Sequence, residues 1–554
     1  MEPSQKSLEP QVDARTAWLF TALALGVTLV AFAPAFVHRS FSYDDAEAIL
    51  ENPVVKGELD LIEAFRRDYW AHRGAVGHYR PTATVSLAID HALFGDDARG
   101  YRVTNWILHA AILCLASLWW RRLRAGFVPL GLMLFGALPW LADSVAWISG
   151  RTSMLAVLPP LAVATAGFVR PGIDRRLWYV LAWSGAFLGL CAKEDALGFL
   201  PLIVVCARGK RRLPTGLVVA TALAAYLGLR FHVYGEALPT AHGAPLADVS
   251  LLERLAHGGR ALVGIVTMDG YTPSYRGHPE YAADRGVAAG YALVSIGVLL
   301  AATAPWALVL RRGIDAGPRW ALVGVAGLAL VPVTQLVPIA EPLAPRYVYA
   351  AFVALAPVAA LARHPALVSV TVLVIGFGLV RTRQAVEVYA DRASHARAIL
   401  EIVPTDVVAW TSLGLAEFET GDLDAARQAL ERAVELDPSH GRAWSNLASI
   451  AVEEGDLERA SDLYRRALQH FEANGVAWIN LGQVEHRLGR HERALAAYTR
   501  ATELLPKLAN AWRGRATALF ELGRNEEARR ALERAEALAP GDAFNARLRK
   551  RLER

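Results

Sequence analysis

Residues 409–438 read AWTSLGLAEFETGDLDAARQALERAVELDP, and the pattern of this stretch returns three times at intervals of 34 residues. The residues that recur are one Trp, one Gly and two Ala: Trp410, Trp444, Trp478 and Trp512; Gly421, Gly455, Gly489 and Gly523; Ala426, Ala460, Ala494 and Ala528; Ala433, Ala467, Ala501 and Ala535. This period predicts two helices per copy, with the Gly ending the first helix and the Trp filling the gap between the pair. Because each copy buries its apolar face only against its neighbours, we expect a curved α-solenoid with a concave surface.

The four copies resemble the tetratricopeptide repeat family and cover residues 407–542. Pro438, Pro506 and Pro540 close three of them, and Glu472 takes that place in the other. The resemblance implies binding of extended peptide segments or other proteins, with a structural or oligomerising role as the alternative, and no catalysis within the repeats. We interpret 381–406 as a linker or helix and 543–554 as a charged tail that forms a solvated helical cap.

Upstream of the repeats, residues 16–380 are largely apolar, in a chain of 554 residues that is 54% hydrophobic. Long uncharged runs predict an all-α fold class, a polytopic membrane bundle of about 11 helices followed by the solenoid. The runs are 16–36, 103–119, 127–142, 152–169, 177–192, 196–207, 214–231, 287–310, 320–338, 347–362 and 366–380. The first is interpreted as a retained signal anchor; a cleavable signal peptide is the alternative. The interrupted segments 83–94 and 251–268 are predicted to lie along the membrane surface.

The basic residues predict the orientation of this bundle. With residues 1–15 in the cytoplasm, the cytoplasmic loops are 119–126, 170–176, 207–214, 311–319 and 361–366, and the first four of them are rich in Arg and Lys. The short loops opposite carry about one basic residue each, as the positive-inside rule requires. The long loops 37–102 and 232–286 and the repeats are then extracytoplasmic. The frequent use of Arg and Ala suggests a bacterial inner (cytoplasmic) membrane, and the small net charge of +5 does not indicate a nucleic-acid partner.

Two adjacent carboxylates follow the first predicted span, in the stretch FSYDDAEAILENP (41–53). Asp44 and Asp45, here called the acidic doublet, either cap the helix that begins there or supply a general base on the outer face. They could also hold a divalent cation, but no further clear ligands accompany them. The three cysteines form no C-x-x-C pair, so neither a zinc site nor a disulfide framework is predicted.

Further polar residues stand at the outer ends of the predicted spans. Asn105 and His109 are four residues apart and share one face of a helix. Ionisable residues near a membrane are costly and are most often functional or paired. The candidates that join the doublet on this side are Arg80, Asn105, His109, Arg151, Lys193, Glu194 and Arg346.

The order of these segments resembles the GT-C glycosyltransferases, most closely the transmembrane and tetratricopeptide O-mannosyltransferase group. The matching stretches are FSYDDAEAILENPVV, HYRPT, YRVTNWILHA, VAWISGRTSML, CAKEDA and APRYVY. The resemblance implies that a sugar passes from a polyprenyl-phosphate carrier to an acceptor, a protein Ser or Thr hydroxyl, on the extracytoplasmic face. It implies that Asp44 or Asp45 removes the hydroxyl proton. The remaining candidates would bind the donor, and Arg346 is favoured for the phosphate because its loop joins two spans.

Nucleotide-binding fingerprints and an H-E-x-x-H helix do not occur in the sequence, which fits a lipid-linked donor and no other cofactor. Two alternatives stay open. The chain could be a non-catalytic, membrane-anchored scaffold whose repeats assemble envelope proteins. It could also be a ligase or transporter of polyprenyl-linked glycans.

Overall fold

The computed structural model describes residues 14–42, 45–50, 52–56, 61–67, 69, 79–123, 133, 135, 141–170, 172–207, 209–234, 379–506 and 508–553, together with 251, 255–256, 292–297, 300, 325, 349 and 375–376. Among these residues all regular structure is helical, so the predicted all-α class is confirmed. The chain divides into two compact units, Met1–Ala398 and Ile399–Arg554.

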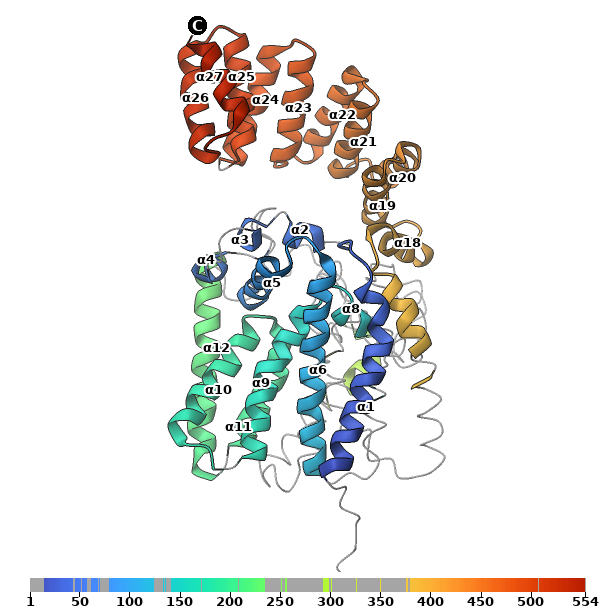
Figure 1. Cartoon of the computed structure of the whole chain (residues 1–554), viewed down its shortest axis with the longest axis vertical. Helices are drawn as coiled ribbons and strands as arrows, with labels where there is room; N and C mark the ends of the chain where they lie inside the picture. Colours follow the sequence, from blue (N-terminus) through green and yellow to red (C-terminus); the bar gives the residue numbers. More distant parts are fainter. Residues whose placement is uncertain are drawn as a thin grey trace, which may run out of the picture. The chain divides into compact units, whose positions relative to one another are not determined.

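The first unit is built from long apolar helices (Figure 1). Its helices are α1 (Ala14–Phe32), η1 (Ala33–Phe36), α2 (Asp45–Ile49), α3 (Pro53–Lys56), α4 (Leu61–Arg66), α5 (Pro81–Phe94), α6 (Ala98–Leu123), α8 (Ala142–Val145), α9 (Arg151–Val169), α10 (Arg175–Leu190), η4 (Glu194–Phe199), α11 (Leu200–Cys206), η5 (Gly209–Arg211) and α12 (Arg212–Tyr234). Helix α18 (Arg392–Ile402) crosses the boundary between the units.

Four described helical segments are long and apolar enough to cross a membrane: Trp18–Phe36, Ala98–Trp119, Arg151–Val169 and Gly209–Tyr234. They coincide with four of the predicted runs, and the chain is a membrane protein. The predicted runs 177–192 and 196–207 form the shorter helices α10 and α11. The run 127–142 and those between 287 and 380 lie almost entirely outside the described residues, so the number eleven stays a prediction.

Close helix packing in this unit depends on small residues. A Cβ atom added at Gly189 of α10 would lie 2.8 Å from the carbonyl oxygen of Ala156 in α9, so the two backbones nearly touch. Association of helices in lipid relies on such close contacts, because lipid chains remove the usual hydrophobic drive. The buried Trp119 indole also joins two helices, since its Nε1–H donates to the Thr165 hydroxyl at 2.8 Å. The helices of this unit are therefore packed closely against one another.

The second unit is a row of antiparallel helix pairs (Figure 1). Its helices are α19 (Val407–Thr420), α20 (Leu423–Leu436), α21 (Gly441–Glu453), α22 (Leu457–His470), α23 (Gly475–Arg487), α24 (His491–Leu504), α25 (Ala509–Glu521), α26 (Asn525–Leu538) and α27 (Ala543–Leu552). The repeated glycine ends the first helix of each pair with a left-handed backbone, as Gly421 does at φ +88°. The solenoid prediction is confirmed.

The repeated tryptophans make the same hydrogen bond in every copy. Each indole Nε1–H donates at 2.8–2.9 Å to the backbone carbonyl six residues earlier, which belongs to Pro404, Pro438, Glu472 or Pro506. Since the acceptor is a carbonyl oxygen, Glu472 serves as well as proline. The rings pack against the cores as partly buried residues, as expected for structural tryptophans.

The charged tail forms α27, which covers the last repeat. Its Leu548 and Leu552 are buried in one cluster with Leu519 and Leu532, while Arg and Lys residues of the same helix remain exposed. A terminal helix with one apolar and one polar face closes the end of a solenoid.

Candidate functional site

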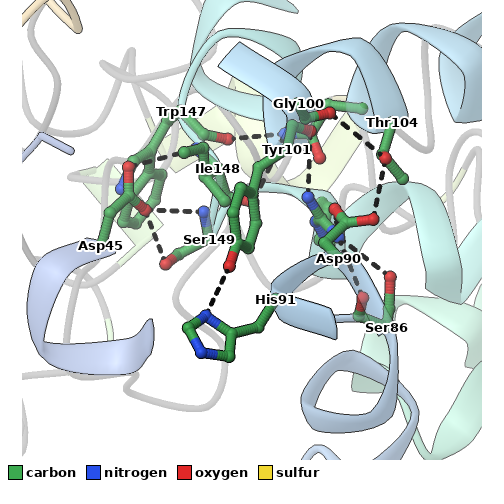
Figure 2. A network of polar contacts seen from close by, with 12 residues as sticks. Asp45, Ser86, Asp90, His91, Gly100, Tyr101, Thr104, Trp147, Ile148 and Ser149 are labelled. Carbon is green, nitrogen blue, oxygen red and sulfur yellow. Dashed lines mark hydrogen bonds and ion pairs between the residues drawn. The ribbon is translucent and has the colours of Figure 1, made fainter. Parts of the chain in front are cut away.

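Asp45 begins α2, and its carboxylate is completely buried. Its Oδ1 atom accepts hydrogen bonds from the Ser149 backbone N–H at 2.8 Å and the Ser149 hydroxyl at 2.7 Å. Its Oδ2 atom accepts from the Ser42 hydroxyl at 3.2 Å and the Ile148 N–H at 3.4 Å. Figure 2 shows Ser149 and Ile148 converging on the carboxylate. A carboxylate offers about four acceptor positions, so these donors occupy them all.

The contacts of Asp45 join α2 to a distant part of the chain. Its carboxylate accepts hydrogen bonds from N–H groups of the segment that leads into α9, and the cap of α2 stays a prediction. Burial raises the pKa of the Asp45 carboxyl, and this effect outweighs the opposing hydrogen bonds from Ser149 and Ile148 and the positive charge of Arg102. Asp44, the other half of the doublet, lies outside the described residues.

The segment 145–149, here called the α8–α9 loop, is also held by Asn105 of α6. The Asn105 side-chain amide donates to the carbonyl oxygens of Val145 at 3.2 Å, Trp147 at 3.0 Å and Ile148 at 3.4 Å. Asp45 and Asn105 therefore bind opposite kinds of backbone group in one buried loop. These two predicted site residues thus hold the same loop.

Arg151 opens α9 and forms a buried ion pair. Its guanidinium lies 2.7 Å from Asp90 of α5, and the two side chains are 0% and 4% exposed. It also donates to the Ser86 hydroxyl at 3.0 Å and to the Tyr101 carbonyl at 3.0 Å, while Thr104 donates to Asp90 at 2.9 Å. Figure 2 shows this group beside the Asp45 group. The charge of Arg151 is thus matched within the protein.

Lys193 and His109 are buried as well. The Lys193 ammonium donates to the hydroxyl of Ser153, one of the first residues of α9, at 3.0 Å. One turn beyond Asn105 on α6, the His109 Nδ1 atom lies 2.8 Å from the Tyr349 hydroxyl, and the imidazole packs against the ring of Phe135. His109 thus joins α6 to a residue 240 positions later in the chain.

The other predicted site residues are placed in part or not at all. Arg80 precedes α5 and is partly exposed. Glu194 opens η4, but its side chain lies outside the described residues, as does Arg346 entirely. Within the described chain, no group of three or more His, Cys, Asp or Glu residues is arranged to hold a metal ion.

Sequence reasoning passed over Arg102, Asp90 and Ser149, which form hydrogen bonds within the same buried network as the residues it selected. The signal was present for two of them, since Arg102 lies within YRVTNWILHA and Ser149 within VAWISGRTSML. Asp90 stands in an apolar run, where an acidic residue needs a partner.

Comparison with known proteins adds two findings. A tetratricopeptide repeat family model matches residues 381–440, 411–475, 446–509 and 479–543, so the C-terminal region consists of such repeats. Among solved structures, similar chains include a crystal structure of MamA protein (23% identity, 26% of this chain and 80% of that one, TM-score 0.24). Another is YrrB, a TPR protein with an unusual peptide-binding site (19% identity, 28% and 81%, TM-score 0.26).

The curated relatives are protein O-mannosyl-transferases. The chain is 27% identical over 173 residues to F38B6.6 of Caenorhabditis elegans, covering 30% of this chain and 24% of the relative. It is 30% identical over 179 residues to Tmtc1 of Drosophila melanogaster (31% and 20%) and 31% identical over 124 residues to TMTC2 of Homo sapiens (21% and 15%). The matched part spans a quarter or less of the length of each of these relatives. The chain is thus a tetratricopeptide-repeat membrane protein with partial similarity to protein O-mannosyl-transferases.

Proposed function

We propose that this chain is a GT-C type membrane glycosyltransferase that moves a sugar from a polyprenyl-phosphate carrier to an acceptor hydroxyl, a protein Ser or Thr, on the extracytoplasmic face. The names of the curated relatives and the four apolar helices support the reaction class and the membrane setting. The observation that carries the proposal is the buried polar network at the N-terminal ends of α6 and α9, which contains Asp45. Polar groups are rarely retained so close to a bilayer without a role.

Basic residues at other helix ends support the orientation that we propose. Arg175 and Arg212 begin α10 and α12, and Arg211 ends η5, at the opposite end from the Asp45 network. By the positive-inside rule that end faces the cytoplasm, and the network then faces outward. A bacterial inner membrane is the setting that we propose from the composition.

The two members of the acidic doublet have different roles in this mechanism. The acceptor positions of the Asp45 carboxylate are filled by protein donors, so it has none left for a substrate proton. We assign Asp45 to holding the α8–α9 loop and assign proton removal to Asp44. The deprotonated hydroxyl oxygen then attacks the anomeric carbon, the bond from that carbon to the carrier phosphate oxygen breaks, and the lipid phosphate departs with the bonding electron pair.

The departing phosphate gains negative charge and needs a cation. Arg346 is the candidate that we favour, because its loop joins two predicted spans, and Lys193 is a further proposed donor contact. The Arg151 guanidinium is matched by Asp90. Arg80, Asn105, His109 and Glu194 remain proposed donor contacts. The repeats would bind the acceptor protein, a peptide-binding role that the family of repeats supports.

The test is transfer by the purified chain in lipid nanodiscs, with radiolabelled polyprenyl-phosphate mannose and Ser/Thr-rich peptides. Asp44→Asn is expected to reduce transfer by at least about 100-fold with an unchanged unfolding temperature. Asp45→Asn is expected to lower both transfer and unfolding temperature. Asp97→Asn is the matched control, because Asp97 is an exposed acid of the same predicted outer loop.

Full transfer by both doublet variants, at normal expression, would reject the catalytic assignment. Failure of the unmodified protein to transfer any sugar, while peptides still bind its repeats, would favour the scaffold.

A further inference from the structure

Arg102 of α6 is a buried cation whose hydrogen bonds all go to backbone carbonyls. It is 1% exposed, and its guanidinium donates to four oxygens. They belong to His38 at 2.6 Å, Ser40 at 2.8 Å, Ala146 at 3.2 Å and Tyr389 at 2.9 Å. No carboxylate lies within ion-pair distance of it among the residues that the structure describes. A planar fork of five N–H donors can bind several oxygens in fixed directions, which an ammonium cannot do.

Three of the four bound carbonyls come from the two segments that surround Asp45. His38 and Ser40 lie in the chain leading into the acidic doublet, where Ser42 donates to Asp45. Ala146 belongs to the α8–α9 loop, whose Ser149 gives Asp45 its two shortest hydrogen bonds. Arg102 therefore fixes both sides of the carboxylate environment.

The remaining carbonyl comes from a segment that precedes the repeats. Residues 385–390 approach the same place through two more contacts. The Glu387 carboxylate lies 3.1 Å from the His38 imidazole, and the Tyr389 ring is stacked on Trp147 with centroids 6.4 Å apart. Three separate contacts join residues 385–390 to Arg102 and to the segments that Arg102 binds, so this junction is part of the fold. Residue 389 stands ten positions before the second unit begins at Ile399.

We propose that Arg102 is a positioning residue that holds residues 38–42, the α8–α9 loop and residues 385–390 in one fixed arrangement for sugar transfer. This rests on the function proposed above. The guanidinium touches no reacting atom; it acts through the backbone on either side of Asp45. Residues 385–390, which precede the repeats, are thereby linked to the site. A change in their conformation should therefore alter the surroundings of Asp45.

The experiment combines kinetics with hydrogen exchange on the full chain in nanodiscs. Arg102→Lys keeps the charge but removes the fork, so we expect kcat to fall about 30- to 100-fold with the donor KM within about twofold. Amide exchange should rise at 38–42 and 385–390 and stay unchanged in the repeats. Arg99→Lys is the matched control, because Arg99 lies one turn earlier on α6 with an exposed side chain bound to Asp97.

Glu387→Gln supplies a second variant that should fold, since Glu387 is more than half exposed. It removes the carboxylate that lies 3.1 Å from the His38 imidazole, and we expect a smaller loss in kcat, about threefold to tenfold, with faster exchange at 38–42. Unchanged kcat and unchanged exchange in both variants would overturn the proposal; if Arg102→Lys does not fold, Glu387→Gln decides alone. If the unmodified protein transfers no sugar, the proposed function fails, and exchange still decides whether Arg102 holds these segments.

Discussion

Removal of either partner of the Arg151–Asp90 ion pair is predicted to destabilise the first unit strongly. The guanidinium and carboxylate lie 2.7 Å apart and are almost wholly buried. Arg151→Met would leave the Asp90 charge in the interior with only the Thr104 hydroxyl as a donor, and Asp90→Asn would leave Arg151 uncompensated. Breaking one side of such a pair costs about 3–5 kcal/mol, which is more than a 100-fold change in the ratio of folded to unfolded protein.

The combined variant Asp90→Asn with Arg151→Met separates a structural role from a binding role. It removes both charges together, so we expect it to recover at least half of the stability lost in Arg151→Met. Thermal unfolding in detergent micelles, followed by the fluorescence of the buried tryptophans, measures this recovery. Single losses below about 1 kcal/mol, or a combined loss equal to the sum of the two, would refute the reasoning.

The donor KM of the same variants tests the sequence-based role of Arg151. If Arg151 only supports the fold, the stable combined variant keeps its KM for the polyprenyl-phosphate sugar. If the folded combined variant has a KM raised at least tenfold, Arg151 would instead be assigned to binding the donor phosphate.

Further outcomes concern both units. Ser149→Ala removes a hydrogen bond that lowers the pKa of Asp45, so the pKa rises further. Because the ionised Asp45 carboxylate is assigned to hold the α8–α9 loop while Asp44 removes the proton, the acidic limb of the rate–pH profile should move to higher pH as the loop is released; an unmoved limb would mean that the charge of Asp45 does not control transfer. In the repeats, Gly482→Ala would place a Cβ 2.8 Å from the Tyr498 ring. The overpacking should destabilise the repeats by about 1–3 kcal/mol, which is more than the roughly 1 kcal/mol that the higher helix propensity of Ala contributes. An increased thermal midpoint of the repeats would contradict this expectation. Trp478→Phe loses the hydrogen bond to the carbonyl six residues earlier and should lower stability by about 0.5–1.5 kcal/mol in the same measurement; an unchanged midpoint would contradict it.

The repeats could be predicted almost completely because their contacts are local in sequence. Each glycine, alanine and tryptophan meets partners in its own or the next copy, so a period of 34 residues contains the structural information. The presence of helices in the membrane unit was also predictable, since the hydropathy of a segment depends only on its own residues. The bounds were less so: the run 177–192 became α10, which is shifted towards the N-terminus, and 196–207 is divided between η4 and α11. Their neighbours determine how such helices end, and the sequence of one segment does not contain that information.

The candidate site could be predicted only as a set of residues. Two partners of Asp45, Ile148 and Ser149, lie 103 and 104 positions further along, and those of Arg102 lie 44 to 287 positions away. Residue type alone could not distinguish Arg151, which is paired with Asp90, from a cation available to a phosphate. The doublet raised the same difficulty: the acceptor positions of Asp45 are filled, and only the fold reveals this.

The α8–α9 loop explains why so many polar residues gather here. Irregular backbone at the edge of a membrane is tolerated only where the protein satisfies its N–H and C=O groups. Asn105 binds three of its carbonyls, Arg102 a fourth, and Asp45 two of its N–H groups. These side chains therefore make a buried loop possible before they contribute to any reaction. It follows that a loss of transfer in Asn105→Ala indicates a direct role in the reaction only if the unfolding temperature is unchanged. If transfer and unfolding temperature fall together, the role of Asn105 is to hold the loop.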